Sequence, residues 1–141
     1  MITTLEKLRQ NSFWFIDYLR GGEIKNHYND IKLTIENYYS PRSVDKRGLS
    51  LVNLLKHATE TTQFYADFKD FKSLSDFPVI NKILIREKFN DLQSEKFKKE
   101  SNHIAQTSGS SGTLLTILQD ANKRKRNTAD TIYFKNRLAL N

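Results

Sequence analysis

The sequence predicts an α-rich α/β fold, in which N-terminal helices lead into a β–loop–β–α unit. Apolar residues recur at helical spacing through the first hundred residues, and the 141-residue chain contains only two prolines. Short segments of strand length first occur after residue 102. We therefore expect a helical region over residues 1–102 and a β–loop–β–α unit over residues 103–141, both parts of one domain.

The most regular helical pattern begins at Ile24. Its apolar residues follow one another in steps of four and three, which places all of them on one face of a helix: Ile24, Tyr28, Ile31, Ile35 and Tyr38. The pair Gly21–Gly22 separates this helix from an aromatic-rich one before it, and Pro41 disfavours helix in the residue that precedes it. We interpret the apolar stripe as core. The alternative is a non-catalytic helical module that binds a partner through the stripe.

Two further helices are expected before residue 102. One starts at about Ser50 and presents Leu51, Leu54, Leu55 and Ala58 on one face. Aromatic packing residues follow it: Phe64, Tyr65, Phe68 and Phe71. Pro78 then breaks the chain, and Asn81 is a good N-cap for a short helix with Ile83, Leu84 and Phe89 toward the core.

The segments "HIAQT" and "LLTILQ" have the length and composition of strands. Asp120 is a suitable N-cap for a last helix over "ANKRKRNTADTIYFKNRLAL". The second strand is apolar on both faces, which is typical of a strand inside a larger sheet, yet no other segment reads as a strand. We therefore expect an incomplete fold, from a truncated gene product, a split gene or an engineered excerpt.

Composition excludes several kinds of site. Without cysteine, the chain cannot form disulfides, thiolate zinc sites or a cysteine nucleophile. His27, His57 and His103 are too scattered for a metal site or a catalytic triad, so we expect them to be structural or exposed, with no metal ligand and no catalytic residue. No apolar run is long enough to span a membrane and no targeting signal is evident, so we expect a cytoplasmic protein.

The net charge of +7 suits a polyanionic partner, and Lys123–Arg126 is the densest basic run. Four consecutive cations on a helix cover more than one face, so they do not point together into one groove of a nucleic acid. No nucleic-acid-binding motif surrounds them. We interpret the run as a solvated helix face, and nucleic acid is the less favoured partner. A positive field that attracts phosphate near the loop is a further alternative.

The segment between the two strands is "TSGSSGT". Glycine allows successive backbone N–H groups to converge, and the hydroxyl groups add donors, so the segment suits a phosphate. A simple serine–glycine hairpin loop is the alternative. The segment does not fit the nucleotide P-loop, which needs four residues between its glycines and a following lysine. Nor does it fit the hydrolase Gly-x-Ser-x-Gly elbow.

The sequence "QTSGSSGTLLTI", followed by "QDANKRKRNTADTIYF", resembles the signature loop of the adenylate-forming ligases. It is most similar to the branch of phenylacetate–CoA ligase and the CapK-type proteins of capsular polysaccharide biosynthesis. "LLKHATETTQFYADF" and "LSDFPVINKILIREKF" resemble upstream segments of that family, in the same order. The resemblance covers roughly residues 50–137.

The resemblance implies an incomplete part of the ligase N-terminal domain that binds the phosphates of ATP, with Mg²⁺. The phosphate loop would consist of Thr107, Ser108, Gly109, Ser110, Ser111, Gly112 and Thr113. Coenzyme A would be a possible acyl acceptor in the full-length enzyme. Leu114 stands where the family usually has proline. The family's adenine pocket, carboxylate pocket and catalytic lysine lie downstream of this loop, so we expect no activity from this chain alone, weak nucleotide binding at most, and a second chain as a possible complement.

Overall fold

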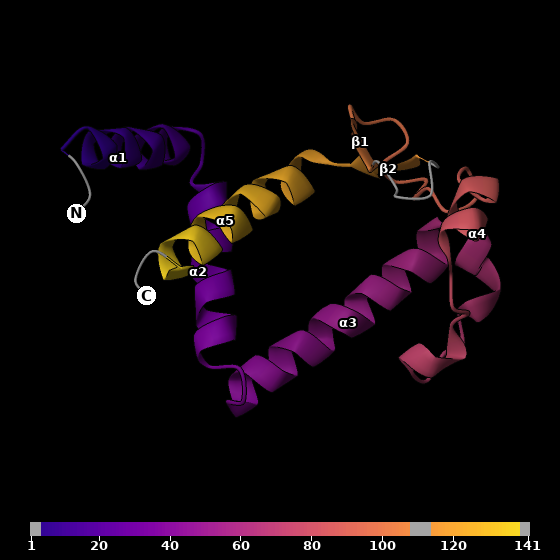
Figure 1. Ribbon diagram of the computed structural model, residues 1–141. Helices are drawn as coiled ribbons and strands as arrows, with labels where there is room; N and C mark the ends of the chain where they lie inside the picture. The colour runs from indigo at the N-terminus through magenta and orange to yellow at the C-terminus, as the bar shows by residue number, and fades with distance from the viewer. Residues whose placement is uncertain (1–3, 108–113, 139–141) are drawn as a thin grey trace. The chain divides into compact units, whose positions relative to one another are not determined.

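The computed structural model describes residues 4–107 and 114–138 (Figure 1). Its elements, in chain order, are α1 (Thr4–Leu19), α2 (Glu23–Glu36), α3 (Pro41–Thr61), the 3₁₀ helices η1 (Gln63–Phe68) and η2 (Leu74–Asp76), α4 (Lys82–Glu87), β1 (His103–Thr107), β2 (Leu115–Gln119) and α5 (Ala121–Leu138). Helices dominate, and β1 and β2 form a small antiparallel sheet. The predicted α-rich α/β class is confirmed.

Contacts group the chain into two compact units. The first unit comprises residues 1–43 and 122–141, and the second unit comprises residues 44–121. The expected boundary after residue 102 marks the change from helices to strands along the chain. The two units divide the chain elsewhere. Helix α5 belongs to the same unit as α1 and α2, whereas the hairpin that precedes it belongs to the other unit.

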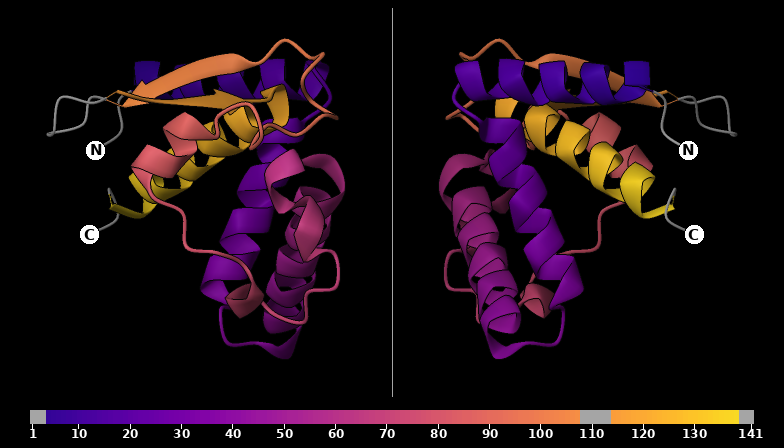
Figure 2. Two further views of the ribbon diagram at one scale, coloured as in Figure 1. Left: turned by 90° about the vertical axis from the view of Figure 1, so that its right-hand side faces the viewer. Right: turned by 90° about the vertical axis from the view of Figure 1, so that its left-hand side faces the viewer.

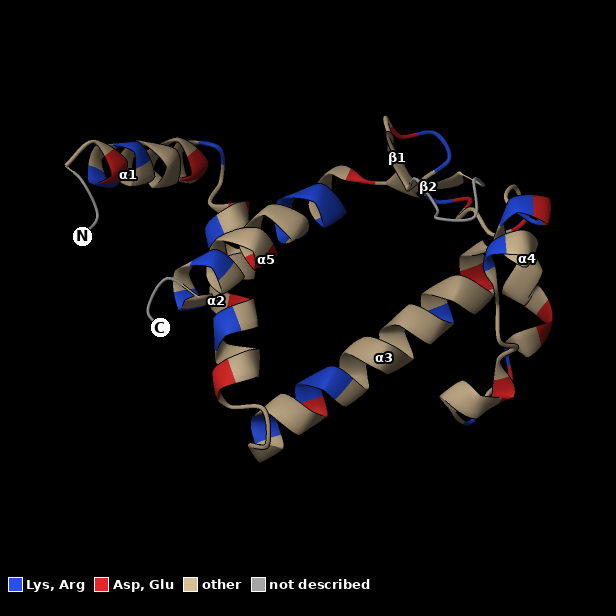
Figure 3. Cartoon of the chain, in the orientation of Figure 1, with Lys and Arg blue, Asp and Glu red and all other residues tan. Residues whose placement is uncertain are grey.

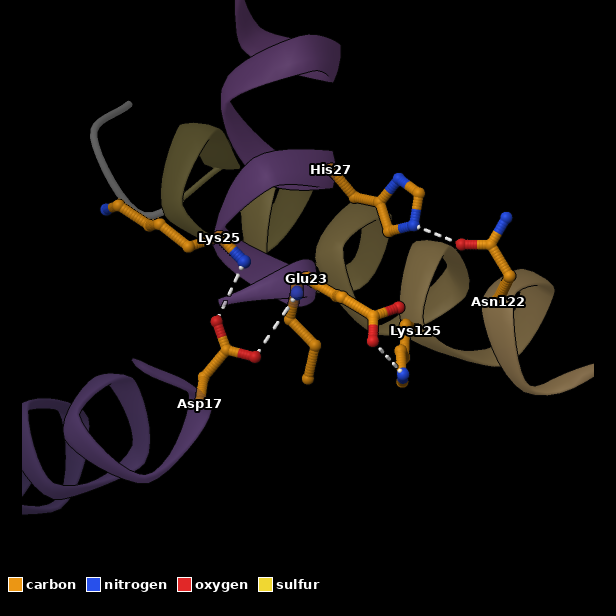
Figure 4. Close-up of polar contacts among 7 residues, drawn as sticks. Asp17, Glu23, Lys25, His27, Asn122 and Lys125 are labelled. Carbon is orange, nitrogen blue, oxygen red and sulfur yellow. Dashed lines mark hydrogen bonds and ion pairs between the residues drawn. The ribbon is translucent and has the colours of Figure 1, made fainter. Parts of the chain in front are cut away.

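In the first unit, a buried carboxylate joins α1 to α2 (Figure 4). Gly21 and Gly22 adopt positive φ angles of 98° and 68°, which turn the chain at the predicted glycine pair. Gly22 is the N-cap of α2 but has no side chain to cap it. The Asp17 carboxylate takes this role by accepting hydrogen bonds from the backbone N–H groups of Ile24 at 3.2 Å and Lys25 at 2.9 Å.

The core of the first unit lies between α2 and α5, which cross each other (Figure 2). Ile31, Ala129 and Tyr133 are buried, and Ile24, Tyr28 and Ile35 pack against them. The interpretation of the apolar stripe as core is therefore confirmed for these four α2 residues. It is wrong for Tyr38, which lies beyond the end of α2 and is exposed.

The expected start of the third helix was wrong, because α3 begins at Pro41 rather than near Ser50. The Ser40 hydroxyl accepts a hydrogen bond from the Ser43 N–H at 3.3 Å, as an N-cap does. Proline is favoured at the first helical position, where its missing N–H needs no partner. The predicted apolar face is also only partly buried: Leu55 is buried and Ala58 half-buried, whereas Leu51 and Leu54 are exposed.

The second unit is held by aromatic packing and by contacts at the end of α3. The predicted packing residues form ring contacts, with Tyr65, Phe68 and Phe71 all gathered around Phe77. The Thr61 hydroxyl accepts a hydrogen bond from the Ser94 hydroxyl at 2.9 Å. The charged segment over residues 93–101 is thus anchored at Ser94, although most of its residues are exposed.

Asn81 caps α4 as predicted, because its side chain accepts a hydrogen bond from the Leu84 N–H at 2.9 Å. The expected core face was wrong for Ile83, which is 64% exposed. Leu84, Ile85 and Phe89 are half-buried instead. The cap determines where the helix starts, but only the partner surface determines which side of so short a helix is covered.

Glycine substitutions offer a test of helix α3. Gly48 lies inside α3, is exposed, and has open space where a Cβ would be placed. We expect Gly48→Ala to raise the free energy of unfolding by about 0.5–1 kcal/mol, because alanine restricts the unfolded chain. The matched change Gly21→Ala should lower it, since the φ angle of 98° strains any residue with a Cβ. Urea unfolding followed by circular dichroism measures both; a destabilised Gly48→Ala variant would contradict the helix.

Asp76 provides a pH-dependent test in the second unit. Hydrogen bonds from the backbone N–H groups of Lys72 and Ser73 lower the pKa of the Asp76 carboxyl group. A lowered pKa stabilises the folded state above about pH 4, and this contribution is lost as the pH falls through the folded-state pKa. Urea unfolding from pH 6 to pH 2.5 should therefore show the deficit of Asp76→Asn shrinking toward low pH. A deficit independent of pH would show that the charge of Asp76 is not involved.

Candidate functional site

The hairpin of β1 and β2 carries the glycine- and serine-rich segment. Residues pair in register from His103 with Gln119 to Thr107 with Leu115. Thr107 is therefore the last residue of β1 and marks the base of the connection between the strands. Of the predicted phosphate-binding residues, only Thr107 lies within the described part of the chain, and it is exposed. Ser108, Gly109, Ser110, Ser111, Gly112 and Thr113 lie outside the described residues.

A hollow of about 340 Å³ lies beside the point where the chain returns from this segment. Leu114 and Thr116 line it from the hairpin, and Arg86 and Phe89 line it from α4 and the turn after α4. Arg86 is exposed and forms no hydrogen bond or ion pair with another described residue. The hollow thus brings a guanidinium group next to the start of β2.

Thr116 has a hydroxyl group available for a ligand. The Gln106 amide donates a long hydrogen bond of 3.5 Å to the Thr116 Oγ1. The hydroxyl oxygen is the acceptor in that contact, so its own proton can be donated elsewhere. A guanidinium, a hydroxyl and an aromatic ring around one hollow can hold an anion such as a phosphate group.

Sequence reasoning missed Arg86 and Thr116 as candidate site residues and assigned Phe89 only to packing. A local signal was available for part of this arrangement. The N-cap at Asn81 sets the start of α4, which places Arg86 in the last turn of this short helix and Phe89 in the turn that follows it. The approach of these two residues to β2 is a tertiary contact, which the sequence pattern does not show.

A second cavity of about 210 Å³ lies on the side of the hairpin that faces the segment after α4. Half of its twelve lining residues are apolar, namely Ile85, Phe89, Leu92, Phe97, Ile117 and Leu118, and the other half are polar or charged. Ile117 is nevertheless 42% exposed, and Ile104 on β1 is 59% exposed. The hairpin therefore has apolar groups that the described residues cover only in part.

Two of the three histidines, His27 and His57, have contacts within the fold. His27 Nε2 lies 2.7 Å from the Asn122 side-chain oxygen, which links α2 to α5 (Figure 4). The His57 ring packs against Phe97 with centroids 5.6 Å apart. His103 is exposed on β1. Residues 4–107 and 114–138 contain no group of three histidine or acidic side chains placed to hold a metal ion.

Part of the basic run is used for packing within the first unit. Lys125 pairs with Glu23 at 2.5 Å, and Arg126 pairs with Asp30 at 3.0 Å. Figure 3 shows the cluster of basic residues in the first half of α5. The interpretation of this run as a solvated helix face was therefore wrong for Lys125 and Arg126, which are half-buried and pair with acidic residues of α2.

Comparison of the chain with protein-family models, curated proteins and solved structures gave no match. In the described part of the chain, none of the helices combines the length and the apolar character that crossing a membrane requires.

Proposed function

We propose that this chain is the N-terminal portion of an ATP-dependent adenylate-forming ligase of the phenylacetate–CoA ligase and CapK branch. The observation that carries the proposal is the segment "TSGSSGT" at the connection of two paired antiparallel strands. A segment rich in glycine and serine can supply backbone N–H groups and hydroxyls to a phosphate. Arg86 and Thr116 beside the start of β2 add donors of the kind that phosphates bind.

The reaction of the complete ligase would be carboxylate activation. A carboxylate oxygen attacks the α-phosphorus of ATP, the bond to the β-phosphate bridging oxygen breaks, and the products are an acyl-adenylate and pyrophosphate. Where coenzyme A is the acceptor, its thiol then takes the acyl group and AMP leaves. Arg86, Thr116 and the residues of the segment "TSGSSGT" would hold phosphate oxygens and orient the nucleotide. ATP would supply the activating group, and Mg²⁺ would accompany it.

The exposed apolar surface supports the idea that further polypeptide packs on this chain. Among the described residues, the buried hydrophobic side chains are few: Ile31, Leu55, Ala129 and Tyr133. The hairpin is a two-stranded sheet, which is marginally stable without further strands or a helical cover. Leu114, Ile104 and Ile117 are exposed on it. Additional strands of a ligase domain, from the same chain or a second one, would cover these residues.

We expect the pure chain to form no pyrophosphate from ATP when a carboxylic acid is added. The reason is that activation needs an adenine pocket, an acid pocket and a catalytic group besides a phosphate loop. A coupled pyrophosphate assay with a panel of aryl and alkyl acids measures this. Pyrophosphate release that depends on an acid would show that this chain is a complete catalyst.

Binding of ATP should be weak, with a Kd in the millimolar range, because one phosphate loop supplies few contacts. In ¹⁵N–¹H correlation spectra, ATP should shift the amides of Thr107 and Thr116. Ser110→Ala and Arg86→Gln should each raise the Kd about fivefold. The control Lys82→Gln removes the same charge from the same helix, outside the hollow, and should leave the Kd unchanged.

The outcomes of this titration separate the functions. ATP shifts that Ser110→Ala does not weaken would contradict the phosphate loop. If Arg86→Gln and Lys82→Gln raised the Kd for ATP equally, Arg86 would not be part of the site. The proposed role of the loop would be unaffected by that result. Micromolar ATP affinity that Ser110→Ala abolishes would mean that the nucleotide site is more complete than proposed. Strong binding of random duplex DNA that falls steeply with salt would favour the nucleic-acid alternative.

A further inference from the structure

The first unit contains a groove that the proposed ligase function does not use. It lies between α1 and α5 and has a volume of about 340 Å³. Eight residues line it: Arg9, Gln10, Phe13, Trp14, Thr128, Ile132, Lys135 and Asn136. The volume is near the lower end of the range of small-molecule sites, so a ligand of one or two fused rings would fit.

The aromatic part of the groove is braced by the core of the unit. Phe13 and Trp14 contact each other edge to face, with ring centroids 5.1 Å apart. Trp14 in turn contacts Tyr28 at 5.7 Å, and Tyr28 contacts the buried Tyr133 at 5.9 Å. The half-buried Trp14 ring is thus held by a chain of aromatic contacts that crosses all three helices. A ring held in this way offers a preformed apolar surface to a flat ligand.

The polar part of the groove is positively charged. Arg9 comes from α1 and Lys135 from α5, and neither forms an ion pair or hydrogen bond with another described residue. None of the lining residues is acidic. The Lys25 ammonium group lies 4.5 Å from the centroid of the Trp14 ring and adds to the positive potential. Lys125 and Arg126 on the same helix α5, by contrast, pair with acidic residues of α2.

We propose that this groove binds a small amphipathic anion, namely an aromatic ring system that carries a sulfonate, phosphate or carboxylate group. The rings would lie against Phe13, Trp14 and Ile132, which are the apolar lining. The anionic group would accept hydrogen bonds from Arg9 and Lys135, and the amides of Gln10 and Asn136 would complete its coordination. The proposal is independent of the ligase function, because it uses no residue of the hairpin or α4.

Trp14 can report ligand binding at this groove, because it is the only tryptophan in the sequence. Its indole N–H gives a single resolved side-chain signal in ¹⁵N–¹H correlation spectra of the whole chain. The probe is 2-naphthalenesulfonate, and 2-naphthalenesulfonamide is a neutral control of nearly the same shape. We expect the sulfonate to shift the indole signal and the Ile132 amide, with about fivefold higher affinity than the sulfonamide.

Charge variants test the polar contacts. Arg9→Gln and Lys135→Gln should each weaken sulfonate binding about fivefold and leave sulfonamide binding unchanged. Arg9 and Lys135 lie on different helices, so if one variant fails to fold, the other still tests the proposal. The dispersion of the amide signals shows whether each variant is folded. Lys7→Gln is the matched control, since Lys7 is exposed on α1 and does not line the groove.

Several results would overturn the proposal. One is a sulfonate that fails to shift the indole signal, and another is an equal affinity for the sulfonate and the sulfonamide. A loss of affinity in Lys7→Gln as large as that in Arg9→Gln would show general charge attraction instead of a site. An indole signal that moves with protein concentration before any ligand is added would show that the groove holds a second copy of the chain.

Discussion

The carboxylate of Asp17 sets the geometry on which the first unit depends. Helix α2 begins at a glycine pair that turns the chain but cannot cap the helix, and the buried Asp17 side chain caps it from the preceding helix. This one interaction caps the start of α2 and ties it to the last turn of α1, which orients the two helices relative to each other. The aromatic contact of Trp14 with Tyr28 depends on that orientation. Helix α5 packs on the apolar residues of α2, where Ala129 is small and fully buried.

Local signals accounted for much of the fold. The glycine pair, the Asn81 cap, the apolar stripe from Ile24 to Ile35 and the two strands are each encoded within a few neighbouring residues, and all were predicted. The first turns of α3 were missed because "PRSVDKRG" has no apolar period, although Ser40 and Pro41 are a good helix start. Ile83 was misplaced because the covered side of a short helix depends on its tertiary partner.

Only one feature of the candidate site could be predicted from the sequence, namely the phosphate-binding chemistry of the loop. The hydroxyl and glycine residues of "TSGSSGT" are contiguous, so their composition alone suggests a phosphate. Arg86 and Thr116 are thirty residues apart and meet only because α4 packs beside β2. The same limit applies to Lys125 and Arg126, whose partners Glu23 and Asp30 are close to a hundred residues away in the chain. A charge run shows how many cations there are, but not which of them are neutralised.

The distinction between paired and unpaired cations changes what the net charge of +7 implies. If all the cations were free, a broad basic surface would be the natural expectation, and with it a polyanion. In the described part of the chain, some of these cations are paired with acidic residues and others are not. Lys88, Lys98, Lys125 and Arg126 pair with acidic residues. Arg86 in the hollow of the second unit, and Arg9 and Lys135 in the groove of the first, have no such pairing with another described residue. These cations line small hollows beside aromatic rings, and the two sites proposed there would suit compact anions with an apolar or aromatic part better than extended polyanions.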